Sequence, residues 1–431
     1  MEYNTFACGS IIQNKIEEHK SGKKAGVYSI CSTNRSVLLA AMQMLRNLPE
    51  PLLIESTCNQ VNQYGGYTGM TPCDFSLYVK SLADESDFPV ERIILGGDHL
   101  GPNPWKNETH AEAMKKAEQL IFDCVTAGYQ KIHLDTSMSC RDDSELTKEE
   151  IAERATRLCF QSEMKTSNRL PVYVIGTEVP IPGGLTAGHD EKAHISNVQD
   201  VEETISIFRK TFMKYGLQRA WDRTIAIVVS PGVEFGDREI FQYSRFQNRA
   251  LRDFIETIPT LVYEAHSTDY QPPSLLRQMV EDHFAILKVG PALTFAYREA
   301  LFNLAAIEKE IPNIDQNLRS NLIEVLLHTM HAQPTHWNEH YQGTPQEIDF
   351  SLKYSFNDRA RYYWGQSSIK SAVEKLIGNL QNTPIPLALI SQYFSVFFRK
   401  VQEGSIQPVS KDLIQASIMR VLENYQFACH I

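Results

Sequence analysis

An acid and an imidazole stand side by side at the end of an apolar run, in residues 95–103 (Leu-Gly-Gly-Asp-His-Leu-Gly-Pro-Asn). Residues 92–95 are predicted to form a short buried strand, and the glycines and proline that follow predict a turn. Asp98 and His99 would then lie at the mouth of the strand. They could do chemistry there, or Asp98 could cap a hydrogen-bonded turn. We favour chemistry because several other predicted strands end in the same way.

Charged and imidazole side chains recur at these predicted strand ends. They are Glu55, Asp98, His99, Asp135, Glu178 and His266, with Lys288 inside the last strand. Two imidazoles and several carboxylates at one mouth can supply the three protein ligands of a catalytic divalent metal. We predict His99, Glu178 and His266 as ligands, and zinc ahead of manganese or cobalt because of the nitrogen content. Alternatively, any one of them could cap a turn or helix, or could form a hydrogen bond to a metal ligand without binding the metal itself.

The other carboxylates of this set, Asp98, Glu55 and Asp135, are the predicted catalytic residues. Asp98 neighbours a predicted ligand but points differently, because side chains alternate along a strand, and this suits a general acid or base near the metal. His133 lies two residues before Asp135 and so shares its strand face. We interpret His133 as a core histidine bonded to a neighbour rather than as a ligand.

The spacing of apolar segments predicts the fold that would bring these residues together. Short β-rich segments alternate with helical patterns at residues 26–31, 51–56, 92–95, 131–137, 171–178, 225–232, 261–267 and 285–290. Eight such repeats predict an α/β protein with a (β/α)8 TIM barrel. A doubly wound open sheet is disfavoured because no GxGxxG turn follows the first strand. We expect a barrel over residues 1–310 and a helical C-terminal extension, residues 311–431, packed on it.

The loops after the last two strands could bind an anionic group. Barrels often bind phosphate there with backbone N–H groups and a helix start. The predicted substrate- and phosphate-binding residues are Ser267, Asp269, Lys288, Gly290 and Thr294. Ordinary helix capping would explain the small hydroxyl residues equally well.

Arginines and aromatic residues cluster in the extension. They are Arg359, Arg361, Tyr362, Tyr363 and Trp364. The cluster could be a partner surface, and packing of the extension on the barrel explains it just as well.

Composition excludes several classes of protein. A chain of 431 residues with a net charge of −10 and no basic stripe is not expected to bind nucleic acid. No apolar leader and no run of about 18 apolar residues is visible, so we expect neither secretion nor a membrane span. The eight cysteines lack a CxxC pair, which predicts reduced thiols and a cytoplasmic protein.

Long motifs of this chain resemble one known family. They are residues 54–72, 95–103, 175–180, 263–271 and 287–296, together with Tyr362-Tyr363-Trp364 and residues 384–387. They are similar to the GatZ/KbaZ family, the Z subunits of D-tagatose-1,6-bisphosphate aldolase, once labelled tagatose-6-phosphate kinases. The kinase label finds no support in the residues, because neither a GxxxxGK[ST] motif nor a kinase-type glycine loop is present.

The resemblance implies a barrel related to class II, metal-dependent aldolases. It matches Asp98-His99 to a catalytic acid followed by a metal histidine, and His266-Ser267 to a second metal histidine and a phosphate loop. Glu178 stands where the catalytic class usually has another histidine. The resemblance further implies a Y-type (GatY/KbaY-like) catalytic partner, an oligomeric assembly and a ketohexose phosphate as ligand.

Two functions therefore stay open. The chain is either an accessory subunit of the aldolase or a metal-dependent ketohexose-phosphate 4-epimerase or aldolase in its own right, acting on tagatose 6-phosphate or fructose 6-phosphate.

Overall fold

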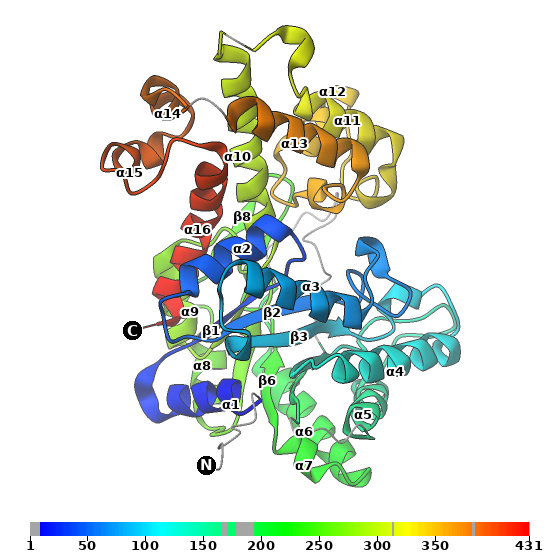
Figure 1. Ribbon diagram of the computed structural model, residues 1–431. Helices are drawn as coiled ribbons and strands as arrows, with labels where there is room; N and C mark the ends of the chain where they lie inside the picture. Colours follow the sequence, from blue (N-terminus) through cyan, green and yellow to red (C-terminus); the bar gives the residue numbers. More distant parts are fainter. Residues whose placement is uncertain (1–8, 165–169, 178–193, 313, 382–383, 431) are drawn as a thin grey trace.

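The structure, a computed structural model, describes residues 9–164, 170–177, 194–312, 314–381 and 384–430 (Figure 1). Eight parallel strands close into a barrel in the order β1-β10-β9-β6-β5-β4-β3-β2. They are β1 (Val27–Ile30), β2 (Leu52–Thr57), β3 (Ile93–Leu100), β4 (Lys131–Leu134), β5 (Val172–Ile175), β6 (Thr224–Val228), β9 (Val262–Ala265) and β10 (Ile286–Val289). Each overlaps a predicted strand, so the predicted TIM barrel is confirmed.

Helices surround the barrel and bury the outer face of the strands (Figure 1). They are α1 (Gly9–Glu18), α2 (Arg35–Leu45), α3 (Pro72–Glu85), α4 (His110–Thr126), α5 (Lys148–Met164), α6 (Val198–Lys214), α7 (Gln218–Trp221), α8 (Arg249–Glu256), α9 (Pro273–Glu281) and α10 (Pro291–Glu310). The exception is α1, whose Ile12 and Ile16 pack with the inward-facing side chains of the strands. The strands read as continuous apolar runs because both of their faces are buried. A two-stranded ribbon, β7 (Glu234–Phe235) with β8 (Ile240–Phe241), was not predicted.

Strand β3 differs from its prediction. The chain does not turn at Gly96 and Gly97, because the strand continues to Leu100 and pairs with β2 up to Asp98. A Cβ atom at Gly96 would lie 2.8 Å from Cγ of Glu55, and one at Gly97 would lie 2.2 Å from Cδ1 of Leu100. The glycines therefore make room for neighbouring side chains inside a strand, which is the other common use of glycine there.

The region after residue 310 is helical, as predicted. Its helices are α11 (Leu322–Ala332), α12 (Pro345–Tyr354), α13 (Ser367–Gln381), α14 (Leu387–Tyr393), α15 (Phe398–Gln402) and α16 (Ser410–Cys429), with a 3₁₀ helix η7 (Arg359–Tyr362). Helix α16 runs beside α10 and also packs against α9 and α2 (Figure 1). The backbone N–H of Gly26 donates to the carbonyl of Cys429 at 2.9 Å. The last helix thus completes the wall of the barrel, and the domain boundary at residue 310 stays a prediction.

No helix in the described part of the chain is long and apolar enough to cross a membrane. The cysteines of the described ranges are free thiols: Cys31, Cys58, Cys73, Cys124, Cys140, Cys159 and Cys429.

A histidine pair closes the opposite end of the barrel from the predicted site. Nδ1 of the fully buried His19 donates to the carbonyl of Ala25 at 2.7 Å, and Nε2 accepts from Nδ1 of His283 at 2.9 Å. Lys24 lies 3.2 Å from the other ring nitrogen of His283. Burial, together with the neighbouring His283, Lys24 and Lys20, lowers the pKa of His19 to about 4. The folded chain therefore keeps His19 neutral where the unfolded chain would protonate it.

This difference predicts a loss of stability at acid pH. Between pH 6.5 and about 4 the unfolded state binds the proton and the folded state does not, so the free energy of unfolding falls with pH by up to about 3 kcal/mol. Urea unfolding of the wild type and of His19→Gln at pH 7 and pH 4.5 measures this. The substitution is expected to flatten the pH profile, and parallel profiles would contradict the assignment.

Candidate active site at the barrel mouth

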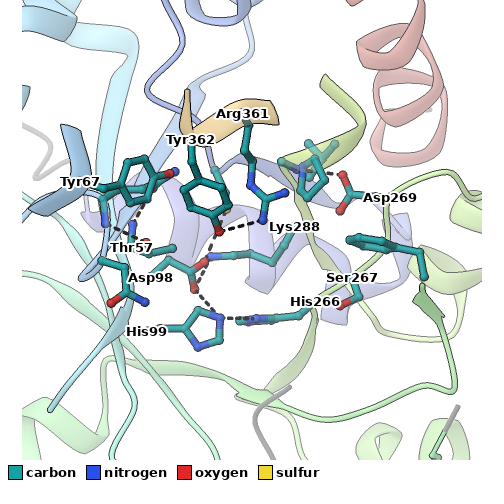
Figure 2. A pocket seen from close by; sticks show the side chains of 17 residues that line it. Thr57, Tyr67, Asp98, His99, His266, Ser267, Asp269, Lys288, Arg361 and Tyr362 are labelled. Carbon is teal, nitrogen blue, oxygen red and sulfur yellow. Dashed lines mark hydrogen bonds and ion pairs between the residues drawn. The ribbon is translucent and has the colours of Figure 1, made fainter. Parts of the chain in front are cut away.

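A cavity of about 120 Å³ lies at the carboxyl-terminal ends of the strands (Figure 2). Predicted site residues that line it are Asp98, His99, His266, Ser267, Asp269, Lys288 and Gly290. Residues that the sequence did not suggest as site residues also line it, among them Cys31, Thr57, Gln60, Tyr67, Arg361 and Tyr362. Strands from the first and the last part of the chain end at this cavity, as the barrel fold requires.

Two histidines contact each other at one side of this cavity, and each is oriented by a carboxylate. Nδ1 of His99 contacts a carboxylate oxygen of Asp135 at 2.8 Å, and Nε2 of His266 contacts Glu264 at 3.0 Å. The remaining nitrogens, Nε2 of His99 and Nδ1 of His266, lie 3.1 Å apart. A carboxylate behind each imidazole is the usual arrangement of metal-binding histidines, because it fixes the ring and its tautomer.

The spacing of this pair fits a tetrahedral metal. Two nitrogens bound to one zinc at about 2.0–2.1 Å lie roughly 3.3 Å apart, close to the distance between His99 and His266. The backbone next to both rings is also unusual, since His99 itself has φ 47° and Ser267 has φ 54°. Non-glycine residues seldom adopt this left-handed conformation, and such strain collects at functional sites.

A second, overlapping donor set lies deeper in the barrel. Ligand atoms of Asp98, His133, Glu264 and His266 all lie within 4.8 Å of one another. Nδ1 of His133 accepts the backbone N–H of His99 at 3.1 Å, and its buried Nε2 has no hydrogen-bond partner among the described residues. An unpartnered buried nitrogen is costly unless something fills the gap beside it. His133, interpreted from the sequence as a core residue, thus joins the group of possible metal donors.

Of the ligand set predicted from the sequence, His99 and His266 come together, and Glu178 lies outside the described residues. Glu55 and Asp135, predicted as catalytic, do not line the cavity. Both are buried behind it and contact residues that do line it. Their geometry is that of positioning groups.

A charged network fills the barrel directly beneath the cavity. Nζ of the fully buried Lys131 lies 2.6 Å from Glu55 and 2.7 Å from Glu264. Lys288 bonds Glu55 and lies 2.9 Å from Asp98. Two lysines thus tie three carboxylates together. Burial of such charges is tolerated only when they are paired in this way.

The protonation states follow from these contacts. Burial disfavours the charged form of Asp98, but the imidazoles of His99 and His266 outweigh it and hold the pKa well below its usual range. Burial also opposes protonation of His99, whose pKa is nevertheless raised to about 9 by Asp98 and Asp135. Burial lowers the pKa of His266. The two imidazoles therefore share one proton along their 3.1 Å contact, in the place where a divalent cation could replace it.

The predicted phosphate loop is built differently from the expectation. The backbone N–H groups of Gly290 and Ala292 donate to the carboxylate of Asp269 at 3.0 and 2.8 Å. Thr294 does not line the cavity, and its hydroxyl bonds Asp358 at 2.5 Å. The amides that the sequence assigned to a phosphate are thus taken by a side chain of the protein, and Thr294 anchors the C-terminal region.

Arg361 and Tyr362 reach the cavity from η7, in the C-terminal region (Figure 2). The sequence interpretation weighed this cluster as a partner surface or as packing. Packing accounts for Tyr363 and Trp364, which are buried, but not for two side chains that line a polar cavity. The signal that could have found them is a pair of adjacent polar side chains beside buried aromatics, which is weak in a single sequence.

The closed barrel with its oriented histidine pair defines a (β/α)8 protein with a candidate metal-dependent active site. Residues 12–430 match the family described as D-tagatose-1,6-bisphosphate aldolase subunit GatZ/KbaZ-like, and the chain belongs to this family. The resemblance noted in the motifs is thereby confirmed.

The chain is also similar to several solved structures. A probable tagatose 6 phosphate kinase from Sinorhizobium meliloti 1021 is 42% identical, with a TM-score of 0.87, over 94% of this chain and 100% of that one. A fructose-bisphosphate aldolase from Campylobacter jejuni is 12% identical, with a TM-score of 0.45, over 87% and 93% of the two chains. The YdjI aldolase from Escherichia coli K12 is 12% identical, with a TM-score of 0.40, over 81% and 93%.

Proposed function

We propose that this chain is the accessory Z-type subunit of a D-tagatose-1,6-bisphosphate aldolase, and that it binds and stabilises a Y-type catalytic subunit. Family membership over nearly the whole chain carries the proposal. The free thiols of the described residues suit a cytoplasmic complex.

We further propose that the barrel mouth holds one divalent metal, with zinc as the best match to the nitrogen donors. His99 and His266 would hold it, with Asp98 beside them and Asp135 and Glu264 orienting the rings. Bound there, the ion would act as a Lewis acid toward substrate oxygens. The chain's own groups would bind and orient the sugar, and the ionised Asp98 would accept a proton from it.

A second function is favoured by one observation. Buried charged residues at the mouth cost stability, and a subunit that only supports a partner has no need of them. The seven predicted site residues that share the cavity therefore suit a ketohexose-phosphate 4-epimerase or aldolase active without a partner.

The experiment that tests the accessory function compares a Y-type subunit alone with the same subunit co-expressed with this chain. The full chain is used, because removing residues after Pro312 would remove α16 from the barrel wall. We expect higher aldolase activity and slower loss of activity in the presence of the chain. Equal activity and equal half-life would contradict the accessory function. The chain alone, incubated with tagatose and fructose phosphates, reports the second function through triose products or an epimer.

A further inference from the structure

The guanidinium of Arg361 lines the cavity, and the proposed function gives it no role. We infer that Arg361 is the receptor for the phosphate group of a sugar phosphate, so that the C-terminal region supplies one end of the substrate site and the barrel supplies the other. This inference rests on the proposed ketohexose-phosphate ligand and assigns its phosphate to a residue outside the barrel.

Arg361 forms no close ion pair within the described part of the chain. Its guanidinium donates to the carbonyls of Asn357 and Asp358, the latter at 3.1 Å, and to the hydroxyl of Tyr362 at 3.0 Å. These acceptors are neutral, and no carboxylate oxygen of the described residues contacts the guanidinium directly. Asp269 and Asp358 attract it only from a longer distance. The nearby Arg298, in contrast, lies 3.6 Å from the carboxylate of Asp358.

The other cationic side chains that line the cavity, His99 and Lys288, are already paired. His99 contacts the carboxylate of Asp135 at 2.8 Å. Lys288 contacts the carboxylates of Glu55 and Asp98, so its charge is balanced within the barrel. A phosphate dianion entering the cavity would therefore meet Arg361, a cation with no carboxylate in direct contact among the described residues. Arginine also suits this role chemically, because its planar fork matches two phosphate oxygens.

The usual phosphate position of a barrel is closed to an anion here. Asp269 accepts the N–H groups of Gly290 and Ala292, which would otherwise point at a phosphate. An anion placed at this loop would be repelled by that carboxylate when it is ionised. The phosphate must then bind elsewhere in the cavity, and Arg361 lines the same cavity as this loop.

The structure holds Arg361 in place. The hydroxyl of Thr294 bonds Asp358 and so ties the start of η7 to the barrel helix α10. The ring of Tyr362 stacks on His336 with centroids 4.9 Å apart and meets Tyr67 edge-on at 4.8 Å. A fixed side chain loses little conformational entropy when it binds a ligand, as a receptor group should.

The arrangement also gives the ligand a direction. Figure 2 shows Arg361 and Tyr362 at one side of the cavity, with His99 and His266 at the other and Lys288 between them. A sugar phosphate bound at Arg361 would extend its hydroxyl and carbonyl groups toward the two histidines. Phosphorylated sugars should therefore bind far better than the free sugars.

Calorimetric titration of the full chain with fructose 6-phosphate, fructose and inorganic phosphate tests the inference. We expect Arg361→Gln to weaken binding of fructose 6-phosphate and of inorganic phosphate by about 10- to 100-fold, and to leave the weak binding of fructose unchanged. Arg361→Lys, which keeps the charge but not the fork, should fall between. Arg399→Gln is the matched control, since Arg399 is an exposed arginine of α15 in the same C-terminal region.

A second measurement uses the wild type and so does not depend on folding of a variant. Phenylglyoxal labelling, read by peptide mass spectrometry, should be slowed at Arg361 by inorganic phosphate and unchanged at Arg399. The inference is overturned if the wild type binds neither fructose 6-phosphate nor phosphate, if Arg361→Gln binds both like the wild type, or if phosphate does not protect Arg361. Stimulation of a Y-type subunit would persist in each of these cases, so the accessory function is judged separately.

Discussion

Lys131→Met is expected to lower the free energy of unfolding by about 3–5 kcal/mol, the cost of leaving buried charges without their partner. Lys131 is fully buried, and it joins Glu55 and Glu264 at 2.6 and 2.7 Å. Once it is removed, Lys288 is the one lysine of the network left to pair with both carboxylates and with Asp98. Urea unfolding followed by circular dichroism measures the difference between the variant and the wild type.

Two further variants show whether the network is the cause. Lys148→Met is the surface control, since Lys148 is about one-quarter exposed and pairs with Asp200 and Glu203 on the outside of the barrel. Its effect should stay within about 1 kcal/mol. Lys131→Met combined with Glu264→Gln should cost less than the sum of the two single changes, because the second substitution removes one of the stranded charges. Strict additivity would refute the network.

The residues of this network show where sequence reasoning stopped. Lys131 and Glu264 lie inside strands β4 and β9, among apolar neighbours, and a single charged residue there gives no sign of its partner. Strand ends were easier to interpret. Asp98, His99 and His266 follow apolar runs, and a parallel barrel must bring such ends together. The structure places these three residues around one cavity, and their predicted roles stay predictions.

Contacts between distant segments could not be predicted in the same way. The glycines of β3 were interpreted as a turn because glycine most often marks one, but Gly96 gives space to Glu55 on the neighbouring strand. Arg361 is brought to the cavity by η7, far along the chain. The spacing of apolar residues indicates local structure, and it contains no information about which distant helix will line the barrel mouth.

Asp98, near the end of β3, carries the largest expected effect on activity. If the chain turns over a ketohexose phosphate, Asp98→Asn should lower the rate on the order of 10²-fold or more, because asparagine keeps the shape but cannot accept a proton. The neighbouring imidazoles hold Asp98 ionised, so the wild-type carboxylate starts in the form that can accept a proton. Turnover and metal content are both measured on the purified variant.

The comparison variants separate proton transfer from metal binding and from partner support. His99→Ala should lose metal and activity together, because it removes one of the two facing ring nitrogens. Asp253→Asn, an exposed carboxylate on α8, should change neither. If the chain is only an accessory subunit, Asp98→Asn and His99→Ala will both leave stimulation of the Y-type subunit intact. The catalytic function of Asp98 is refuted by a folded, metal-loaded Asp98→Asn protein that turns over the sugar phosphate at the wild-type rate.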